Sequence, residues 1–391
     1  MSQYPDRSGN KLSRRGFLKL GAATGASALL ASCGANATPV APAEDLLSSG
    51  AAIPMDKLVP LAQQEGTLSV IALPHDWANW GETIEGFKKK YNIKMNELFP
   101  DAGSADELEA IRANKGNKGA QNPDVVDVGI SYGASGKEEG LFAKFKMSTW
   151  DSIPDNLKDA DGYWWAEYFG VLCFEANPLL VKNMPEDWED LLKPEYKNMV
   201  AVGDPTKGNE SVMAVWAAGI SRMGGKIEGA AEEGLKFWAE MNKAGNMVPV
   251  SMTAGTLAKG ETPLGTRWDY LALADRDTLK GNPEVTVVVP KSGILGGPYA
   301  GAINATGPHP YATRLWVEYY MSDEGQLSML KGYAHPARYN DMAKRGVIPE
   351  ELSKKLPPAE YYEKALFPTL DEINAAKKVI SENWRKVVFG E

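Results

Sequence analysis

The chain has 391 residues, 43% of them hydrophobic and 24% charged, which is a globular composition and enough length for two domains of ordinary size. The first 32 residues hold five basic groups and one acidic group, so the remainder carries 37 basic and 50 acidic groups, a net charge of −13. So negative a surface repels nucleic acid and anionic lipid, and we expect no nucleic-acid partner. Two cysteines exclude a disulfide scaffold and a Cys-based zinc site, and three histidines leave little for a metal centre, so we expect no metal and no cofactor.

The N-terminal segment has the parts of an export signal. Arg14 and Arg15 precede a Phe-Leu-Lys run and a short, weakly apolar stretch over residues 20–30, and the sequence Leu-Ala-Ser then precedes Cys33. The twin arginines resemble the signal of the twin-arginine export pathway, and Leu-Ala-Ser-Cys resembles a bacterial lipobox. These resemblances imply that residues 1–32 are a signal peptide, that Cys33 is lipid-modified, and that the mature protein is held by its lipid in the bacterial cell envelope.

A basic, disordered N-terminus with an incidental arginine pair is the alternative for this segment. The residues that follow are mostly Ala, Gly, Pro and Ser, so the range 33–55 is expected to be a flexible tether. No apolar run reaches the roughly 18 residues that a membrane-spanning helix needs.

The body alternates between strand and helix patterns. Short β-branched apolar runs bounded by Gly or Pro predict buried strands, and amphipathic runs predict helices. Short connections between the first elements favour right-handed crossovers and parallel pairing. Strands are predicted over residues 67–73, 123–130, 199–202, 284–290 and 299–305, and helices over 83–91, 104–113, 188–192, 212–222, 234–243, 311–321 and most of 349–388.

Three stretches in this order carry a resemblance to a known family. They are the Trp-x-x-Leu segment within residues 185–197, the Val-Pro-Lys-Ser-Gly run at 289–293 followed by Ala-Gly-Ala-Ile at 300–303, and the helix end at 319–326. Together they resemble an extracellular solute-binding protein of an ABC importer. The resemblance implies an α/β, two-lobe periplasmic-binding-protein fold of type II, with a mixed sheet flanked by helices in each lobe and a ligand cleft between them.

This resemblance also implies a division of the chain and a role. Lobe 1 is expected at 56–170 with 291–345, lobe 2 at 171–290, and a C-terminal helical segment at 346–391. Such a protein is not an enzyme: it closes around a small solute by hinge motion and delivers it to a membrane permease. We expect it to act as a monomer.

Candidate ligand contacts lie in loops that follow predicted strands, where open α/β sheets place their ligand sites. One such loop, residues 75–80, holds two indoles three positions apart beside a carboxylate, and aromatic faces beside carboxylates hold organic cations. Within the class, the chain is most similar to spermidine/putrescine-binding proteins, although Trp268 and Asp269 are adjacent here where that family spaces them. The expected ligand contacts are Asp76, Trp77, Trp80, Tyr132, Glu210, Trp268, Asp269 and Tyr299.

The sequence leaves other ligands, and an enzymatic function, as alternatives. The Gly-containing loop 203–211 offers backbone N–H groups at a helix start, which suits an anion such as a phosphonate, and ferric iron and thiamine are further alternatives. The sequence Gly-Ile-Ser-Tyr-Gly at 129–133 matches the Gly-x-Ser-x-Gly signature of a hydrolase, with Ser131 as nucleophile and His309 or His335 as base. The two glycines that follow predict no helix here, which speaks against a hydrolase.

Overall fold

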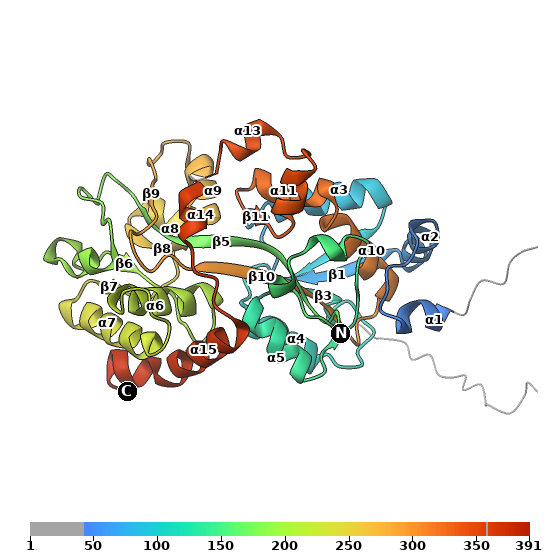
Figure 1. Cartoon of the computed structure of the whole chain (residues 1–391), viewed down its shortest axis with the longest axis horizontal. Helices are drawn as coiled ribbons and strands as arrows, with labels where there is room; N and C mark the ends of the chain where they lie inside the picture. The colour runs from blue at the N-terminus through green and yellow to red at the C-terminus, as the bar shows by residue number, and fades with distance from the viewer. Residues whose placement is uncertain (1–42, 357–358) are drawn as a thin grey trace, which may run out of the picture. The chain divides into compact units, whose positions relative to one another are not determined.

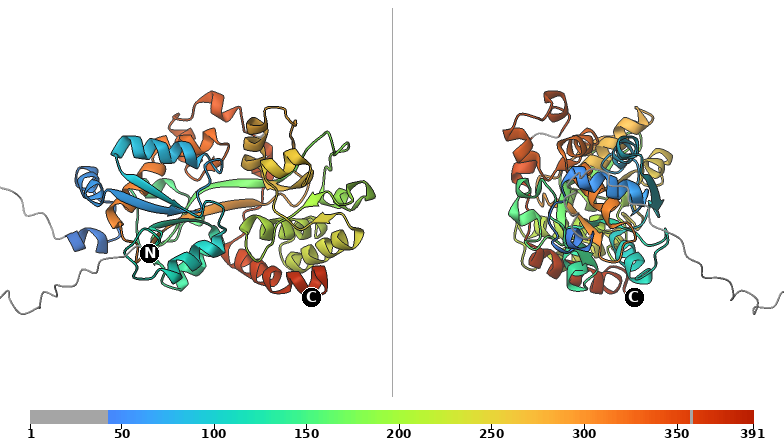
Figure 2. Two further views of the ribbon diagram at one scale, coloured as in Figure 1. Left: turned by 180° about the vertical axis from the view of Figure 1, so that it is seen from behind. Right: turned by 90° about the vertical axis from the view of Figure 1, so that its right-hand side faces the viewer.

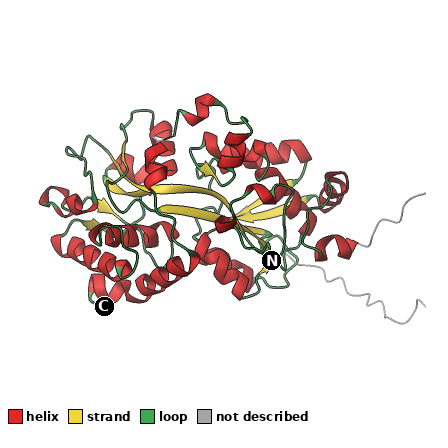
Figure 3. Ribbon diagram, viewed as in Figure 1, coloured by secondary structure: helices red, strands yellow, loops and turns green. Residues whose placement is uncertain are grey.

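A mixed sheet runs through the centre of the protein, and helices cover its faces (Figures 1 and 3). The computed structural model describes residues 43–356 and 359–391. Within these residues eleven strands join in one sheet. They are β1 (Thr67–Ile71), β2 (Lys94–Leu98), β3 (Val125–Gly129), β4 (Phe142–Ala143), β5 (Trp165–Ala176), β6 (Val200–Ala201), β7 (Met247–Val248), β8 (Leu264–Trp268), β9 (Thr286–Val288), β10 (Gly296–Asn304) and β11 (His335–Pro336).

The helices alternate with these strands in the chain. The α-helices are α1 (Ala43–Ser48), α2 (Met55–Glu65), α3 (Trp80–Tyr91), α4 (Ser104–Ala113), α5 (Ile130–Glu138), α6 (Asn209–Arg222), α7 (Ala230–Ala244), α8 (Ala254–Lys259), α9 (Asp269–Leu279), α10 (Pro310–Tyr320), α11 (Asp323–Lys331), α12 (Tyr339–Lys344), α13 (Glu350–Ser353), α14 (Ala359–Lys364) and α15 (Leu370–Trp384). Short 3₁₀ turns are η1 (Trp150–Ser152), η2 (Asp155–Leu157), η3 (Trp188–Leu192) and η4 (Pro194–Tyr196), and one π-helical turn is η5 (Arg385–Phe389).

The strand order divides the sheet into the two lobes of an α/β fold. In the first lobe the order is β2-β1-β3-β10, with β1 parallel to β2 and β3, and β10 antiparallel to β3. Strand β5 pairs with β10 and then continues into the second lobe, where it pairs with β8 and β9. Strands β6 and β7 complete the second lobe. Strands β5 and β10 therefore lie side by side where the lobes meet (Figure 1).

Buried aromatic side chains fill both lobes. In the first lobe Trp80, Phe87 and Trp316 pack with ring centroids 5.2 to 5.7 Å apart. In the second, Phe174 lies edge-on to Trp188 at 5.1 Å. All five side chains are almost fully buried, including Trp80, which the sequence predicts as a ligand contact.

Helix α5 corrects one expectation. It begins directly after β3, although the glycines of this segment predict no helix. A Cβ at Gly136 would lie 2.3 Å from the Phe142 ring, and one at Gly133 would lie 3.1 Å from the Trp164 indole. The glycines are needed because the helix packs too closely for side chains there, and this packing outweighs their poor helix propensity.

The C-terminal helix α15 contacts both lobes. It packs against α6 and α7 of the second lobe and against α5 of the first (Figure 2, left view). The Ser381 hydroxyl donates to the Pro205 carbonyl at 3.5 Å, and the Lys377 ammonium lies 3.0 Å from the centre of the Tyr132 ring. This last contact joins the helix to the first lobe.

The predicted signal peptide, 1–32, and Cys33 lie outside the described residues. Part of the predicted tether is described: α1 lies within it, and the Lys146 backbone N–H donates to the Gly50 carbonyl at 2.7 Å. Among the described residues, no helix combines the length and the apolar character that crossing a bilayer requires.

Candidate functional site

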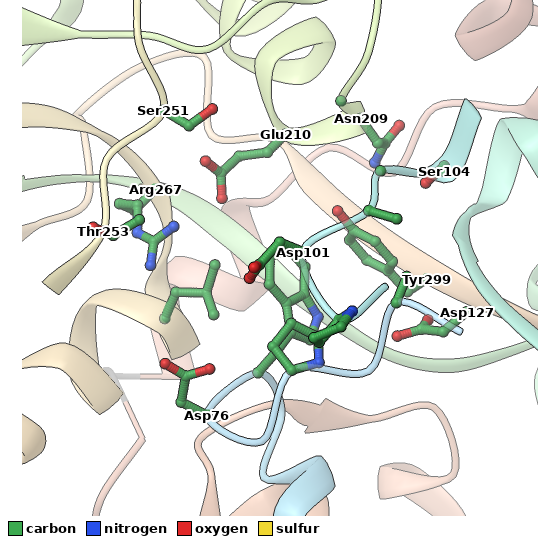
Figure 4. Close-up of a pocket in the computed structure, with 18 of the residues that line it drawn as sticks. Asp76, Asp101, Ser104, Asp127, Asn209, Glu210, Ser251, Thr253, Arg267 and Tyr299 are labelled. Atoms are coloured by element: carbon green, nitrogen blue, oxygen red, sulfur yellow. The ribbon is translucent and has the colours of Figure 1, made fainter. Parts of the chain in front are cut away.

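A cavity of about 540 Å³ lies between the two lobes (Figure 4). The first lobe contributes the loops after β1 and β2, the start of α4, and single residues of β3 and β10. The second lobe contributes the start of α6, the segment before α8, and residues of β8 and α9. Its polar lining residues include Asp76, Asp101, Ser104, Glu107, Asp127, Asn209, Glu210, Ser211, Ser251, Thr253, Arg267, Asp275 and Tyr299.

The loop after β1 places Trp77 at the cavity. Ala78 and Asn79 both have positive φ, 47° and 59°, which turns the chain sharply into α3. The Asn79 side-chain amide donates to the Ser328 carbonyl at 2.9 Å and so holds the turn to α11. Trp77 consequently lines the cavity, while Trp80, one turn later, is buried under the loop.

Aromatic rings form the wall between the cavity and the strands that join the lobes. Trp77 lies edge-on to Tyr299 at 5.4 Å and to Tyr270 at 5.8 Å. Behind it, Tyr168 of β5 stacks on Tyr299 of β10 with centroids 5.6 Å apart and planes at 6°. Trp77 and Tyr299 therefore present aromatic surface to whatever fills the cavity.

Carboxyl groups make up most of the charged lining. Burial raises the pKa of the Asp127 carboxyl to about 6 and the pKa of Glu107 well above its usual range. It also raises the pKa of Glu210 and of Asp275. Glu210 accepts a hydrogen bond from the Trp268 backbone N–H at 3.3 Å. A positive group in the cavity would favour the ionised form of each of these acids.

Arg267 is the one basic residue of the described lining, and acids surround it. Its Nη2 donates to Asp275 Oδ2 at 3.1 Å, and its Nε lies 3.3 Å from Glu175 Oε2. Glu175 is fully buried behind it, and burial raises the pKa of this carboxyl to about 8. The guanidinium is therefore already paired with the Asp275 carboxyl group.

Two helix N-termini also reach the cavity. Gly103 and Ser104 begin α4 in the first lobe, and Gly208 and Asn209 begin α6 in the second. A Cβ at Gly103 would lie 2.7 Å from the Lys207 carbonyl oxygen, so the two lobes are in contact beside the cavity. Free backbone N–H groups at such termini attract negative charge.

The structure brings four of the eight expected ligand contacts together: Asp76, Trp77, Glu210 and Tyr299 line the cavity. The other four do not line it. Trp80 is buried in the first lobe, where its Nε1 donates to Asp127 Oδ2 at 3.1 Å, and Tyr132 is covered by Lys377.

Trp268 and Asp269 also lie behind the wall. Trp268 ends β8, is fully buried, and faces Tyr299 edge-on at 6.4 Å. Asp269 begins α9 and accepts hydrogen bonds from the Val171 backbone N–H at 2.9 Å and the Tyr362 hydroxyl at 2.7 Å. This carboxylate thus ties α9 to β5 and to the C-terminal segment.

Sequence reasoning missed several lining residues, among them Asp127, Arg267 and Asp275. Asp127 carries a signal, because it is a charged residue in the middle of a predicted buried strand. Arg267 lies in a stretch for which no element is predicted, although it lies in β8, and Asp275 faces it from α9.

The hydrolase alternative finds no matching geometry. Ser131 is fully buried and is not among the residues with positive φ, so it lacks the exposed, strained turn of a nucleophile elbow. His309 Nδ1 is hydrogen-bonded to Asp124 at 2.8 Å, and His335 stacks on Phe169 at 4.3 Å. Among the described residues, no group of three or more His, Cys, Asp or Glu side chains is placed to hold a metal ion.

The fold occurs in solved periplasmic binding proteins. The periplasmic binding protein P5PA is 18% identical, with a TM-score of 0.67 over 83% of this chain and 99% of that one. AfuA from Actinobacillus pleuropneumoniae, solved with bound fructose-6-phosphate, is 19% identical, with a TM-score of 0.65 over 83% and 99%. A Listeria monocytogenes protein provisionally named a spermidine/putrescine ABC transporter is 14% identical, with a TM-score of 0.61 over 81% and 98%.

Sequence comparison agrees with the fold. A Salmonella typhimurium protein provisionally named a 2-aminoethylphosphonate-binding periplasmic protein is 22% identical over 326 residues, which are 81% of this chain and 90% of the relative. Residues 120–375 match the family described as bacterial extracellular solute-binding protein, and this match spans more than half of the chain. The chain is therefore a member of the bacterial extracellular solute-binding protein family.

Proposed function

We propose that this protein is the substrate-binding component of an ABC importer and that its solute carries a positively charged amino group. The cavity between the lobes is the binding site, and Asp76, Trp77, Glu210 and Tyr299 are its ligand contacts. Closure of the lobes around the solute creates the form that a permease recognises. The predicted lobe limits, export by the twin-arginine route, lipid attachment at Cys33 and a monomeric state belong to the same proposal.

The charge of the lining is the observation that carries the assignment. Six carboxyl groups face the cavity, namely Asp76, Asp101, Glu107, Asp127, Glu210 and Asp275, against the single Arg267. Because Asp275 already pairs with Arg267, the guanidinium does not offset the other carboxyl groups. A cationic group favours the ionised form of these carboxyl groups, whereas a purely anionic solute opposes it.

The aromatic wall supports the same assignment. Trp77 and Tyr299 present ring surface beside Asp127 and Glu210, and an ammonium held against aromatic faces gains about 0.5 to 2 kcal/mol per contact. A few such contacts with a charge-assisted hydrogen bond reach a micromolar site, about −8 kcal/mol.

A solute with a phosphonate in addition to the amine is a second candidate. The N-termini of α4 and α6 both reach the cavity, one from each lobe, and they suit an anionic oxygen group. The relative named for 2-aminoethylphosphonate supports this solute, which carries both charges.

Calorimetric titration of the purified protein with three probes tests the assignment. Spermidine carries amines alone, ethylphosphonate carries the anion alone, and 2-aminoethylphosphonate carries both. We expect an amine-bearing probe to bind at least about tenfold more tightly than ethylphosphonate. Equal or tighter binding of ethylphosphonate, or binding of none of the three, would overturn the ligand class and leave the family membership intact.

A further inference from the structure

Trp77 is connected to the strands between the lobes by a chain of hydrogen bonds. Its indole Nε1 donates to the Tyr168 hydroxyl at 2.6 Å, and that hydroxyl donates to Asp127 Oδ2 at 2.6 Å. Trp77 comes from the loop after β1, Tyr168 from β5 and Asp127 from β3. One relay therefore spans the ligand-facing loop and two strands of the sheet.

The far end of the relay is a strong acceptor. Asp127 is buried, and its Oδ2 also accepts the Trp80 indole N–H, while its Oδ1 has no hydrogen-bond partner in the described structure. Its neighbour Glu167 is fully buried, and burial beside Asp127 raises the pKa of the Glu167 carboxyl well above its usual range. Two donors, the Trp80 indole N–H and the Tyr168 hydroxyl, therefore converge on one oxygen of the Asp127 carboxyl group.

The middle of the relay lies where the lobes join. Tyr168 and Tyr299 are paired residues of β5 and β10, and their rings stack. Tyr299 in turn contacts both Trp77 and the cavity. A ligand that presses on Trp77 therefore acts on a group fixed to β5, the strand that pairs with both lobes.

We propose that Tyr168 and Asp127 are positioning residues, which hold the Trp77 indole in its ligand-facing orientation and couple it to the strands that join the lobes. Neither residue needs to touch the solute through these atoms. The role in ligand binding rests on the function proposed above, whereas the relay consists of contacts within the chain alone.

The substitution Tyr168→Phe removes the middle of the relay and keeps the ring stack. Tyr270→Phe is the matched control, because Tyr270 is buried, also packs edge-on to Trp77, and its hydroxyl has no hydrogen-bond partner in the described structure. The first readout is solvent exchange of indole N–H groups by ¹H–¹⁵N spectroscopy on ligand-free protein. Loss of one signal in Trp77→Phe identifies Trp77 among the eleven tryptophans.

In Tyr168→Phe we expect the Trp77 indole N–H to exchange about tenfold faster, because it loses its acceptor. In Tyr270→Phe the rate should stay unchanged, and the Trp80 indole N–H, whose acceptor is Asp127, should be unaffected in both variants. An unchanged Trp77 rate in Tyr168→Phe, or equal acceleration in the control, would overturn the relay.

The second readout is affinity for spermidine and 2-aminoethylphosphonate. We expect about fivefold to tenfold weaker binding in Tyr168→Phe and a change within about twofold in Tyr270→Phe. Faster exchange with unaltered affinity would overturn the positioning role. If neither probe binds the parent protein, the proposed ligand class fails, and the exchange rates alone decide the relay.

Where Tyr168→Phe does not fold, Asp127→Asn tests the relay from its other end. An uncharged amide oxygen is a weaker acceptor for the Trp80 indole N–H and for the Tyr168 hydroxyl. The Trp80 indole N–H should therefore exchange faster, and so should the Trp77 indole N–H, because its acceptor, the Tyr168 hydroxyl, is held less firmly. Exchange that stays slow at both would contradict the relay.

Discussion

Glu210 is the carboxylate whose role in the cavity can be isolated most cleanly. It lies at the start of α6, and its Oε2 already accepts the Trp268 backbone N–H. Glu210→Gln keeps an oxygen for that bond and removes the charge. Because a hydrogen bond to a charged group contributes about 1.5 to 3 kcal/mol, we expect affinity for an amine probe to fall about tenfold or more by calorimetry.

Glu228→Gln is the control for this variant, since Glu228 is exposed outside the cavity lining. It removes the same charge from the protein and should leave affinity unaltered. If both variants bind equally well, Glu210 does not contact the amine.

Glu175 should make the stability of the protein depend on pH. Burial raises the pKa of this carboxyl from 4.5 to about 8, so the folded state holds its proton more tightly than the unfolded state does. The resulting stability is complete below about pH 4.5 and is lost as the pH rises through about 8. In denaturant unfolding between pH 5 and 9, the parent protein should therefore lose stability relative to Glu175→Gln.

An exposed glutamate provides the comparison for Glu175. Glu261→Gln alters a solvated side chain, and its unfolding free energy should follow the parent protein across the same pH range. If the unfolding free energy of Glu175→Gln also follows that of the parent protein, Glu175 is ionised across this whole pH range.

The sequence predicts residues that line the cavity where a single loop determines their position, as at Asp76 and Trp77. It fails where the outcome depends on packing between distant segments. Trp80 is three residues beyond Trp77, yet the turn at Ala78 and Asn79 directs it into the core. Asp269 resembles a ligand contact, but its acceptor oxygens are used by β5 and the C-terminal segment.

At the scale of elements, amphipathic helices and short apolar strands are predicted well, whereas a long buried strand that contains polar residues is not. The predicted helix over 104–113 matches α4 residue for residue, because a single apolar face decides it. Strand β5 was not predicted. Almost all of its twelve residues are buried, so apolar and polar residues do not alternate along it, and Glu167, Gly170 and Glu175 interrupt its apolar run. The polar groups of β5 serve the site and the junction between the lobes.

Helix α15 should be held to the first lobe by the contact between Lys377 and Tyr132. Desolvation lowers the pKa of Lys377 to about 8, and its ammonium lies 3.0 Å from the ring centre. Tyr132→Leu should leave this charge half-buried without its aromatic partner. A double-mutant cycle with Lys377→Met, followed by thermal unfolding, should give a coupling energy of about 1 kcal/mol.

The neighbouring Lys378 supplies the reference cycle. It is exposed on the same helix, so the pair Tyr132→Leu and Lys378→Met should show additive effects. If the effects of Tyr132→Leu and Lys377→Met on stability are also additive, this contact does not link α15 to α5.

For the whole molecule, the order of weak motifs predicts the two-lobe fold better than any single element does. Each motif alone is short, but together they resemble a two-lobe protein, and in the structure the chain leaves the first lobe through β5 and returns through β10. The contact between the lobes could not be predicted, because it depends on backbone approach. At Gly103 the α4 terminus comes close to the Lys207 carbonyl of the other lobe, and the sequence alone does not reveal that distance.

The short distance between Gly103 and the Lys207 carbonyl predicts that Gly103→Ala prevents full closure of the two lobes. The backbone of Gly103 is extended at φ −94°, so alanine can adopt this conformation without strain. Its Cβ, however, would lie 2.7 Å from the Lys207 carbonyl oxygen, and a backbone atom cannot move aside by changing a side-chain rotamer. The lobes must then separate beside the cavity. We expect a larger radius of gyration by small-angle scattering, an unaltered melting temperature, and binding of an amine probe about tenfold weaker, because the closed form is the one that the solute favours.

Gly208→Ala is the matched substitution on the facing lobe. Its added Cβ would meet only the Ser211 hydroxyl, at 3.8 Å, which is an ordinary contact. It should leave the radius of gyration unaltered, so a change confined to Gly103→Ala assigns the effect to the interlobe contact. If Gly103→Ala scatters as the parent protein does, the α4 terminus does not limit closure, and the lobes accommodate the methyl group by a shift of the loop around Lys207.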